Sequence, residues 1–210
     1  MREFYRGLAK FVGVVVVIGA IAVAVLYAFF VRVVEVGHNA MAPTVMAGDT
    51  IVVWKTQSFE LGDAVLCRYP GQSGRYALAR IVARAGQQLV IDGSGHITIN
   101  GDSPDRDLHS ELAWDDTTTG RRTPVNWADE EILGHNYRYF WRPNLVRGSR
   151  SPRRVERGYF LLNDNRLAAG EDSRAFGPVM AADCIGTLLM RLEAGPSPEE
   201  IGNARFDLLE

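Results

Sequence analysis

The chain has 210 residues, 47% of them hydrophobic, so it can bury one sizeable core and is expected to form one or at most two compact domains. Its formal net charge is −2, with 25 acidic against 23 basic residues, and this balance gives no electrostatic case for binding nucleic acid. The sequence has no glycine-rich phosphate loop, and its four histidines lack the spacing of metal ligands, so we expect no cofactor and no metal.

The first 31 residues predict a membrane anchor. Residues 1–10 carry three cations against one acid, and residues 11–31 contain no charged side chain. Twenty-one helical residues measure about 32 Å, which is enough to cross the core of a bilayer. A cleaved secretory signal is the alternative, but the apolar run is too long for one. We therefore expect an uncleaved transmembrane helix.

The charges around this helix predict its orientation. Arg2, Arg6 and Lys10 precede the span, whereas Arg32 is soon followed by Glu35. The positive-inside rule therefore places the N-terminus in the cytoplasm and the remaining chain outside the cytoplasmic (inner) membrane. Aromatic residues near the outer end of the span suit the interfacial belt, where membrane lipid would be a contact partner; they are Tyr27, Phe29 and Phe30.

Short β-like runs separated by turn signals follow, and they predict a mainly β fold with antiparallel hairpins. The runs are Thr50–Lys55, Ala64–Arg68, Tyr76–Arg84, Gln88–Asp92, His96–Asn100 and, near the end, Cys184–Leu192. Between Ser103 and Glu156 the pattern weakens. There we favour one more strand over a binding surface for Tyr137–Trp141, and a mobile solvated loop over a lipid-headgroup site for Arg147–Arg157. A tail from Gly195 is expected to hold one short helix after Pro196.

The two cysteines, Cys67 and Cys184, are too few and too far apart in sequence for a disulfide framework or a zinc site. Two separate, partly buried thiols are the simpler interpretation, and the sequence leaves their pairing open.

The stretch Val36–Asp49, V-G-H-N-A-M-A-P-T-V-M-A-G-D, has an extended entry and two turns before a strand. It resembles the nucleophile segment of signal peptidase I, whose pattern is roughly S-x-S-M-x-P-T followed by G-D and a strand. The later runs L-G-D-A-V-L, A-L-A-R-I-V and I-T-I-N-G-D are similar to the family's R-G-D-I-V-x-F, I-K-R-V-x-G and I-N-G, in the same order. The resemblance implies a signal-peptidase-like antiparallel β domain, with Met41 and Pro43 at its peptide-binding surface.

Residues 158–179 resemble a second family block, G-x-Y-F-x-x-G-D-N-R, a serine-containing spacer and D-S-R-x-x-G-x-V. The matching residues are Asp164, Asn165, Arg166, Asp172, Ser173, Arg174 and Gly177. Asn163 departs from the pattern by replacing the glycine, and the spacer at 167–171 is one residue longer and has no serine. We interpret the retained charged residues as a structural network that holds this loop to the sheet.

With this resemblance, the chain divides into a cytoplasmic N-terminus (1–10), a transmembrane helix (11–31), an extracytoplasmic signal-peptidase-like β domain (32–193) and a C-terminal tail (194–210).

The catalytic positions implied by the resemblance are both alanine. The family's serine nucleophile falls on Ala40, and its lysine general base falls on Ala79. The family's oxyanion-side hydroxyl falls on His38, whose imidazole could still donate a hydrogen bond. Arg80 cannot act as the base, because a guanidinium does not deprotonate in proteins. Lys55, the single lysine of the outer domain, does not lie at the family position and is a remote candidate for a relocated base.

The sequence therefore leaves three hypotheses. The first is a pseudopeptidase that binds signal peptides ending in A-x-A, preproteins or a partner without cutting; an active signal peptidase or the export machinery is a further candidate partner. The second is a genuine signal peptidase I in which serine and lysine were exchanged for alanine. Two losses to alanine favour this exchange, whereas Asn163, His38 and the missing spacer serine favour a natural loss. The third is a hydrolase that uses His38 with another nucleophile.

Overall fold

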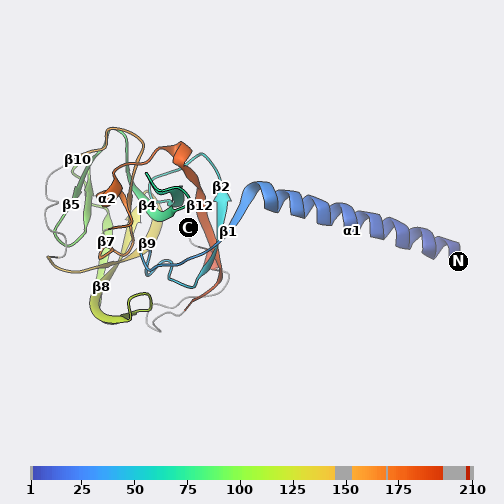
Figure 1. Ribbon diagram of the computed structural model, residues 1–210, viewed down its shortest axis with the longest axis horizontal. Coiled ribbons are helices and arrows are strands. Elements are labelled where there is room, and N and C mark those ends of the chain that lie inside the picture. Colours follow the sequence, from blue (N-terminus) through green and yellow to red (C-terminus); the bar gives the residue numbers. More distant parts are fainter. Residues whose placement is uncertain (1, 145–152, 169, 196–206, 209–210) are drawn as a thin grey trace.

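The computed structural model describes residues 2–144, 153–168, 170–195 and 207–208. Helix α1 (Arg2–Phe30) leads away from a β-rich domain and carries the N-terminus at its far end (Figure 1). Its segment Phe4–Phe30 is long and apolar enough to span a membrane, and its most apolar stretch is not buried against the rest of the described chain. The expected single helix is thus present. It ends one residue earlier than predicted, because Val31 already belongs to a strand.

The described part of the β domain contains three antiparallel sheets. The largest has the strand order β1-β2-β12-β3-β4-β11, with β13 paired to β12. Its strands are β1 (Val31–Glu35), β2 (Thr50–Lys55), β3 (Ala64–Arg68), β4 (Tyr76–Arg84), β11 (Tyr159–Leu162), β12 (Cys184–Glu193) and β13 (Asp207–Leu208). The second sheet has the order β10 (Arg153–Arg154), β5 (Gln88–Ile91) and β6 (Ile97–Ile99). The third has β7 (Asp105–Asp116), β8 (Arg121–Ile132) and β9 (His135–Trp141).

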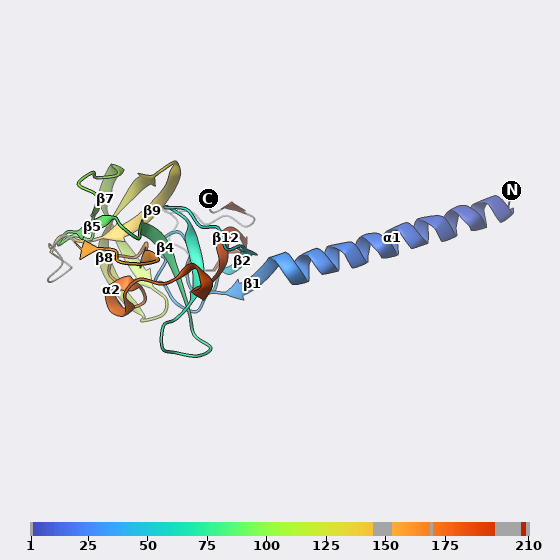
Figure 2. The same cartoon turned by 90° about the horizontal axis from the view of Figure 1, so that it is seen from above.

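Two short helices, α2 (Ser173–Phe176) and η1 (Ala181–Asp183), lie between β11 and β12. Seen in both views, β5 lies at the end of the domain opposite to α1 (Figures 1 and 2).

The mainly β prediction is confirmed, and β2, β3 and β4 have the predicted bounds. Strand β9 confirms the strand predicted around Tyr137–Trp141. Three expectations need correction. Strands β7 and β8 fill much of the region where the pattern was weak; Arg153–Arg154 pair with β5 instead of lying in a loop; and Asp207–Leu208 of the expected tail pair with β12. Residues 147–152 of the arginine-rich segment and most of the tail, with its expected helix, lie outside the described residues.

The anchor helix is joined to the main sheet without a connecting loop. Strand β1 follows α1 directly and pairs with β2 along its whole length. At the junction the ring of Phe30 stacks on that of Trp54, with centroids 5.5 Å apart. The Lys55 ammonium donates a hydrogen bond of 2.8 Å to the carbonyl oxygen of Ala28. A cation that satisfies a carbonyl at the C-terminal end of a helix is stabilising, so Lys55 serves the anchor.

Two apolar clusters meet at the stretch between β1 and β2. The main cluster lies among the strands of the large sheet and includes Met41 and Val45. The second, smaller cluster lies under the β7–β8 hairpin and includes Ala42 and Met46, together with Trp114. Because neighbouring residues of one short segment enter different clusters, this segment is fixed from both sides.

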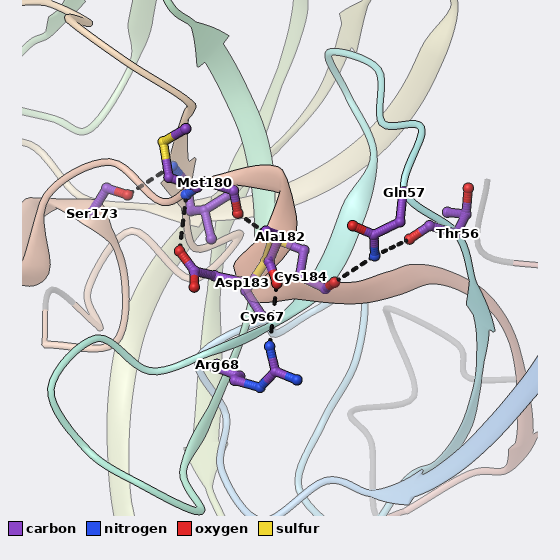
Figure 3. Close-up of a disulfide and its surroundings, with 10 residues drawn as sticks. Thr56, Gln57, Cys67, Arg68, Ser173, Met180, Ala182, Asp183 and Cys184 are labelled. Atoms are coloured by element: carbon purple, nitrogen blue, oxygen red, sulfur yellow. Dashed lines mark hydrogen bonds between the residues drawn. A yellow bond between two sulfur atoms is a disulfide. The ribbon is translucent and has the colours of Figure 1, made fainter.

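Cys67 and Cys184 form a disulfide, so their interpretation as separate thiols is wrong (Figure 3). They lie opposite each other in the register of β3 and β12. Their separation of 117 residues in sequence is bridged because β12 inserts between β2 and β3 in the sheet. Close to the bridge, Gln57 donates a hydrogen bond of 3.1 Å to the carbonyl oxygen of Cys184, and Arg68 donates one of 3.2 Å to that of Ala182.

We expect the disulfide to stabilise the domain, because it closes a long loop in the unfolded chain. Replacing both cysteines by alanine should lower the free energy of unfolding by about 2–4 kcal/mol. Unfolding of the full chain in detergent by increasing guanidinium chloride would measure this difference, with neither an oxidant nor a reductant added. A reductant should destabilise the natural chain and leave the double-alanine variant unchanged. Equal unfolding midpoints for both proteins without reductant would contradict the expectation.

Candidate functional site

The segment between β1 and β2 folds back on itself before it enters β2. The amide of Val36 donates to the carbonyl of Asp49 at 2.9 Å, and the amide of Gly48 donates to the carbonyl of Val36 at 2.8 Å. A turn inside this closed loop has the amide of Val45 donating to the carbonyl of Met41 at 3.0 Å. Ala40, the nucleophile position, lies just before this turn and is 3% exposed.

A buried ion pair holds this loop against β4. The guanidinium of Arg80 donates to both carboxylate oxygens of Asp164, at 2.9 and 2.7 Å, and to the carbonyl of Gly62 at 2.6 Å. The hydroxyl of Thr44 donates to the same carboxylate at 2.6 Å. Charge-assisted, bidentate bonds of this kind are strong and directional. They fix three chain segments, the loop, β4 and the turn after β11, to one point.

A second buried carboxylate fixes the end of the loop. Asp49 accepts hydrogen bonds from the amide of Met46 at 2.9 Å, from Arg191 Nε at 2.9 Å and from the amide of Gly195 at 2.6 Å. Arg191 also donates to the carbonyl of Thr44. The loop that carries Ala40 is therefore tied to β12 as well as to β4, and its shape does not depend on the residue at position 40.

Ala79, the general-base position, lies in β4 opposite Val65 of β3 and is fully buried. In the pairing of β11 with β4, Leu162 lies opposite Arg80. The pairing ends there, so Asn163, the residue predicted to stand in place of the family's glycine, directly follows the last paired residue of β11.

Asn163 is fully buried and only partly satisfied. Its Nδ2 donates to the carbonyl of Ala168 at 2.7 Å, and its amide donates to Asp172 Oδ2 at 3.0 Å. Among the described residues its Oδ1 has no hydrogen-bond partner. An unsatisfied buried acceptor is costly, by about 1–3 kcal/mol, so this position is one where the chain does not follow the packing rules of an ordinary core.

The turn after β11 links the two alanine positions. The amide of Asn165 donates to the carbonyl of Ala40 at 3.0 Å, and its side chain donates to the carbonyl of Asn39 at 2.9 Å. Two residues earlier in the chain lies Asn163, which follows directly on β11. The turn after β11 therefore contacts the loop of Ala40 and follows a strand that pairs with β4, the strand of Ala79.

The retained residues of the second family block make the contacts that a structural role requires. Asp172 caps α2 by accepting from the amide of Arg174 at 2.9 Å and pairs with its guanidinium at 2.7 Å. The guanidinium of Arg174 also donates a hydrogen bond of 2.7 Å to the carbonyl oxygen of Arg166. The hydroxyl of Ser173 accepts a hydrogen bond from the amide of Leu161 at 2.9 Å. These bonds join the spacer, α2 and β11 into one unit.

Arg166 extends this unit into the core. Its guanidinium donates to the carbonyl of Asn163 at 2.6 Å and to the hydroxyl of Tyr137 at 3.2 Å, and it lies 4.7 Å from the ring centre of Tyr139. The nearest carboxylate oxygen, of Glu130, is 3.5 Å away. Burial, together with Glu130, raises the pKa of Tyr137 well above its usual range, so its hydroxyl stays protonated and can donate to that carboxylate.

His38 lies beside Ala40 and keeps one nitrogen available. Its Nδ1 accepts a hydrogen bond of 3.3 Å from the amide of Ala40, which in a neutral ring places the proton on Nε2. Partial burial lowers the pKa of His38, and the nearby Glu171 carboxylate opposes this shift. The ring is therefore neutral near pH 7, and its donor is Nε2–H.

A pocket of about 360 Å³ opens beside Ala40, and its lining includes His38. The β7–β8 hairpin contributes Trp114 and residues of its tip to the lining, and the spacer contributes Leu167. The hairpin is held here by Asn39, whose Nδ2 donates to Asp116 Oδ1 at 2.6 Å. The sequence analysis missed this contribution; the turn-forming run D-D-T-T-T-G at 115–120 was the signal that a hairpin tip was present.

Other predicted site residues have different positions from those expected. Met41 is fully buried in the main cluster, and Pro43 is buried and forms a β-bridge with Tyr139. Both side chains therefore support the turn from the protein interior and do not form the surface that a ligand would contact. Lys55 lies at the end of β2 remote from Thr50, about 16 Å along the strand, with its ammonium on the anchor helix. It is not placed to act as a base at Ala40.

The fold defines a class of protein: a mainly antiparallel β domain behind one helix that could span a membrane, with a closed, buried loop between β1 and β2. The model of the family described as Signal peptidase, peptidase S26, matches residues 8–192, and the chain belongs to that family. A search of curated proteins finds no match to the chain.

We expect the Arg80–Asp164 pair to be essential for the site's shape. Asp164→Asn leaves a buried guanidinium without its counter-charge and should lower the free energy of unfolding by about 3–5 kcal/mol. The matched control is Asp115→Asn, because this carboxylate is exposed and only 3.9 Å from an equally exposed Arg122; its effect should stay within about 0.5 kcal/mol. Thermal and denaturant unfolding would measure both. Similar, small losses in the two variants would show that the buried pair does not fix the loop.

Proposed function

We propose that the chain is a membrane-anchored pseudopeptidase of the signal peptidase I type, which holds export signals at the outer face of the cytoplasmic membrane without cutting them. The observation that carries this proposal is a loop held in place by two buried carboxylates while both predicted catalytic positions are alanine. The loop around Ala40 is fixed by Asp164 and Asp49, and a pocket lies open beside it.

Covalent peptide hydrolysis needs an activated nucleophile and a base within hydrogen-bond reach. A methyl group at position 40 cannot attack a carbonyl, and a methyl group at position 79 cannot accept a proton. Arg80, the neighbouring cation, already donates to Asp164 and Gly62 and stays protonated. His38 is neutral but has its Nδ1 committed to the amide of Ala40. The site therefore has the shape of a peptidase site without the catalytic side chains.

Binding uses different parts of such a site from those used in catalysis. A bound peptide needs a surface, a strand edge or a pocket, and these survive the loss of two side chains. Alanine at position 79 also removes an amine that the enzyme would have to keep neutral in a buried place. Because Met41 and Ala79 are fully buried, a ligand would approach Ala40 from its open side, where the pocket lies.

Two features support the outer face as the location. The cations before the span, Arg2, Arg6 and Lys10, favour a cytoplasmic N-terminus. The Cys67–Cys184 disulfide suits an oxidising compartment, where such bonds persist.

A second candidate is a genuine signal peptidase I whose serine and lysine were exchanged for alanine. The observation that favours it is that both positions carry the same small residue. Asn163 favours the natural loss, because an exchange of the serine and the lysine alone would not also replace the glycine of the family pattern at position 163. The coding sequence of the source gene would decide: codons for serine at 40 and lysine at 79 would end the pseudopeptidase proposal.

We expect no cleavage of a preprotein with an A-x-A site by the chain as it stands. The double variant Ala40→Ser, Ala79→Lys should recover only weak activity, because the spacer has no serine to support the lysine. Gel assays in detergent would follow the appearance of the mature product. Near-normal turnover of the double variant would favour the exchanged enzyme. Saturable cleavage by the natural chain, lost on mutating His38 or Lys55, would refute the proposal.

We also expect labelled signal peptide ending in A-x-A to bind the chain in nanodiscs better than a peptide with bulky residues at both alanines. Ala40→Phe should weaken this binding at least tenfold, because it fills the open side of the loop, a loss of about 1.4 kcal/mol. Ala182→Phe, an exposed alanine in η1, is the matched control and should bind normally. If the natural chain does not distinguish the two peptides, the chain is better regarded as a scaffold for a partner protein.

A further inference from the structure

Strand β12 is longer than β3 and β13, which share one of its edges. Strand β2 pairs with β12 within residues 186–193 and occupies the other edge. On the shared edge, β3 pairs within residues 184–187, and β13 pairs at Met190 and Arg191. Residues 188–189 lie between these two pairings and pair with neither strand. The backbone of β12 is therefore open at this point, on one edge.

A pocket of about 490 Å³ adjoins this gap. Its lining includes residues 187–189 of β12, Gly62 and Asp63 before β3, and the turn between β8 and β9. The walls are packed closely, since a Cβ at Gly62 would lie 2.6 Å from the Cβ of His135. The gap thus combines an unpaired strand edge with a preformed cavity, and an added strand can pair with such an edge while one of its side chains enters the cavity.

The tail of the chain already uses this edge. Leu208 lies opposite Met190, and Asp207 lies opposite Arg191, in an antiparallel pairing. Two paired residues form few hydrogen bonds, so this pairing depends on the covalent link that keeps the tail close to β12. Main-chain hydrogen bonds at a strand edge are not specific to one sequence. The edge that receives the tail is therefore suited to other extended segments.

We propose that the shared edge of β12 is a second peptide site, which takes an extended segment of a partner protein in place of the tail. Its pocket and the pocket beside Ala40 have no lining residue in common, so this inference goes beyond the proposed function. The partner segment runs antiparallel to β12, as β13 does. After the residue opposite Met190 it continues along residues 188–189 to the pocket, and it therefore pairs with more of β12 than β13 does.

The charged groups of the pocket lining select a side chain of the partner segment. They are Asp63, Arg80 and His135. Arg80 is already paired with Asp164. Asp63 Oδ2 accepts from the amide of Glu60 at 2.8 Å, whereas Asp63 Oδ1 lies 4.0 Å from His135 Nδ1, which is too far for a hydrogen bond. A lysine ammonium in the pocket would donate to this oxygen. The site therefore favours a segment with a basic residue at the position that enters the pocket.

The test measures binding of a labelled copy of residues 203–210, N-A-R-F-D-L-L-E, to the full chain in nanodiscs. The tail competes with this peptide at a high effective concentration, so the natural chain should bind it weakly. In the double-proline variant, Asp207→Pro with Leu208→Pro, neither residue can donate to β12, and the peptide should bind about tenfold more tightly. The control peptide N-A-R-F-P-P-L-E carries the same prolines and should not bind.

A second comparison tests the pocket. On the double-proline variant, N-A-R-F-D-L-K-E should bind about fivefold more tightly than N-A-R-F-D-L-L-E, and adding Asp63→Asn should remove this gain. Asn136→Trp, at an exposed residue of the lining, should also remove the gain because the indole fills the pocket. Gln72→Trp, equally exposed and outside the lining, is the matched control and should keep the gain.

The lysine and leucine peptides can also be compared on the natural chain at higher concentration, so the test does not depend on folding of the double-proline variant. Equal affinities of the natural and double-proline chains for N-A-R-F-D-L-L-E would overturn the inference, and so would equal binding of the proline peptide. Equal affinities for the lysine and leucine peptides would refute the choice of a basic segment. Failure of the A-x-A signal peptide to bind would count against the proposed function alone.

Discussion

The bidentate contact of Arg80 with Asp164 is the constraint on which the site depends. Its two partners come from β4 and from the turn after β11, and the hydroxyl of Thr44 adds the loop that carries Ala40. Each buried charge is stabilised by the other, because removing one would leave the other with its full desolvation cost uncompensated. The three segments are therefore held in one arrangement by side chains other than those at positions 40 and 79. The shape of the site depends on these contacts and not on the residues at the two predicted catalytic positions.

The amount of the fold that the sequence predicts follows from where apolar residues lie. Strands β2, β3 and β4 could be bounded correctly because they are runs of buried apolar residues between turn signals. Strands β7 and β8 could not, because most of their side chains are exposed or half-buried and carry charges on both faces. Their stability comes from pairing across a long hairpin, and the sequence of one strand alone does not show which strand it pairs with.

The site was predictable to a similar degree. Its two alanines and the charged residues of the second block could be placed from motif spacing, but burial could not, so Met41 and Pro43 were expected at the surface. The disulfide was missed because the neighbours of a strand in a sheet need not be its neighbours in the chain: β12 lies between β2 and β3, and this order alone brings Cys184 to Cys67. The pocket was missed for the same reason, since its wall is the unpredicted hairpin.

Asn163 is a position where the buried polar network around the site is incomplete. Its Nδ2 donates to the carbonyl of Ala168 and its backbone amide donates to Asp172, whereas its Oδ1 has no hydrogen-bond partner among the described residues. A buried acceptor without a donor costs about 1–3 kcal/mol, so packing alone does not explain a carboxamide here. Asn163 follows directly on the last residue of β11 that pairs with β4, and it precedes Asp164, the partner of Arg80. The departure from the family pattern at 163 therefore lies within the segment that fixes the loop of Ala40, and not at an unrelated surface position.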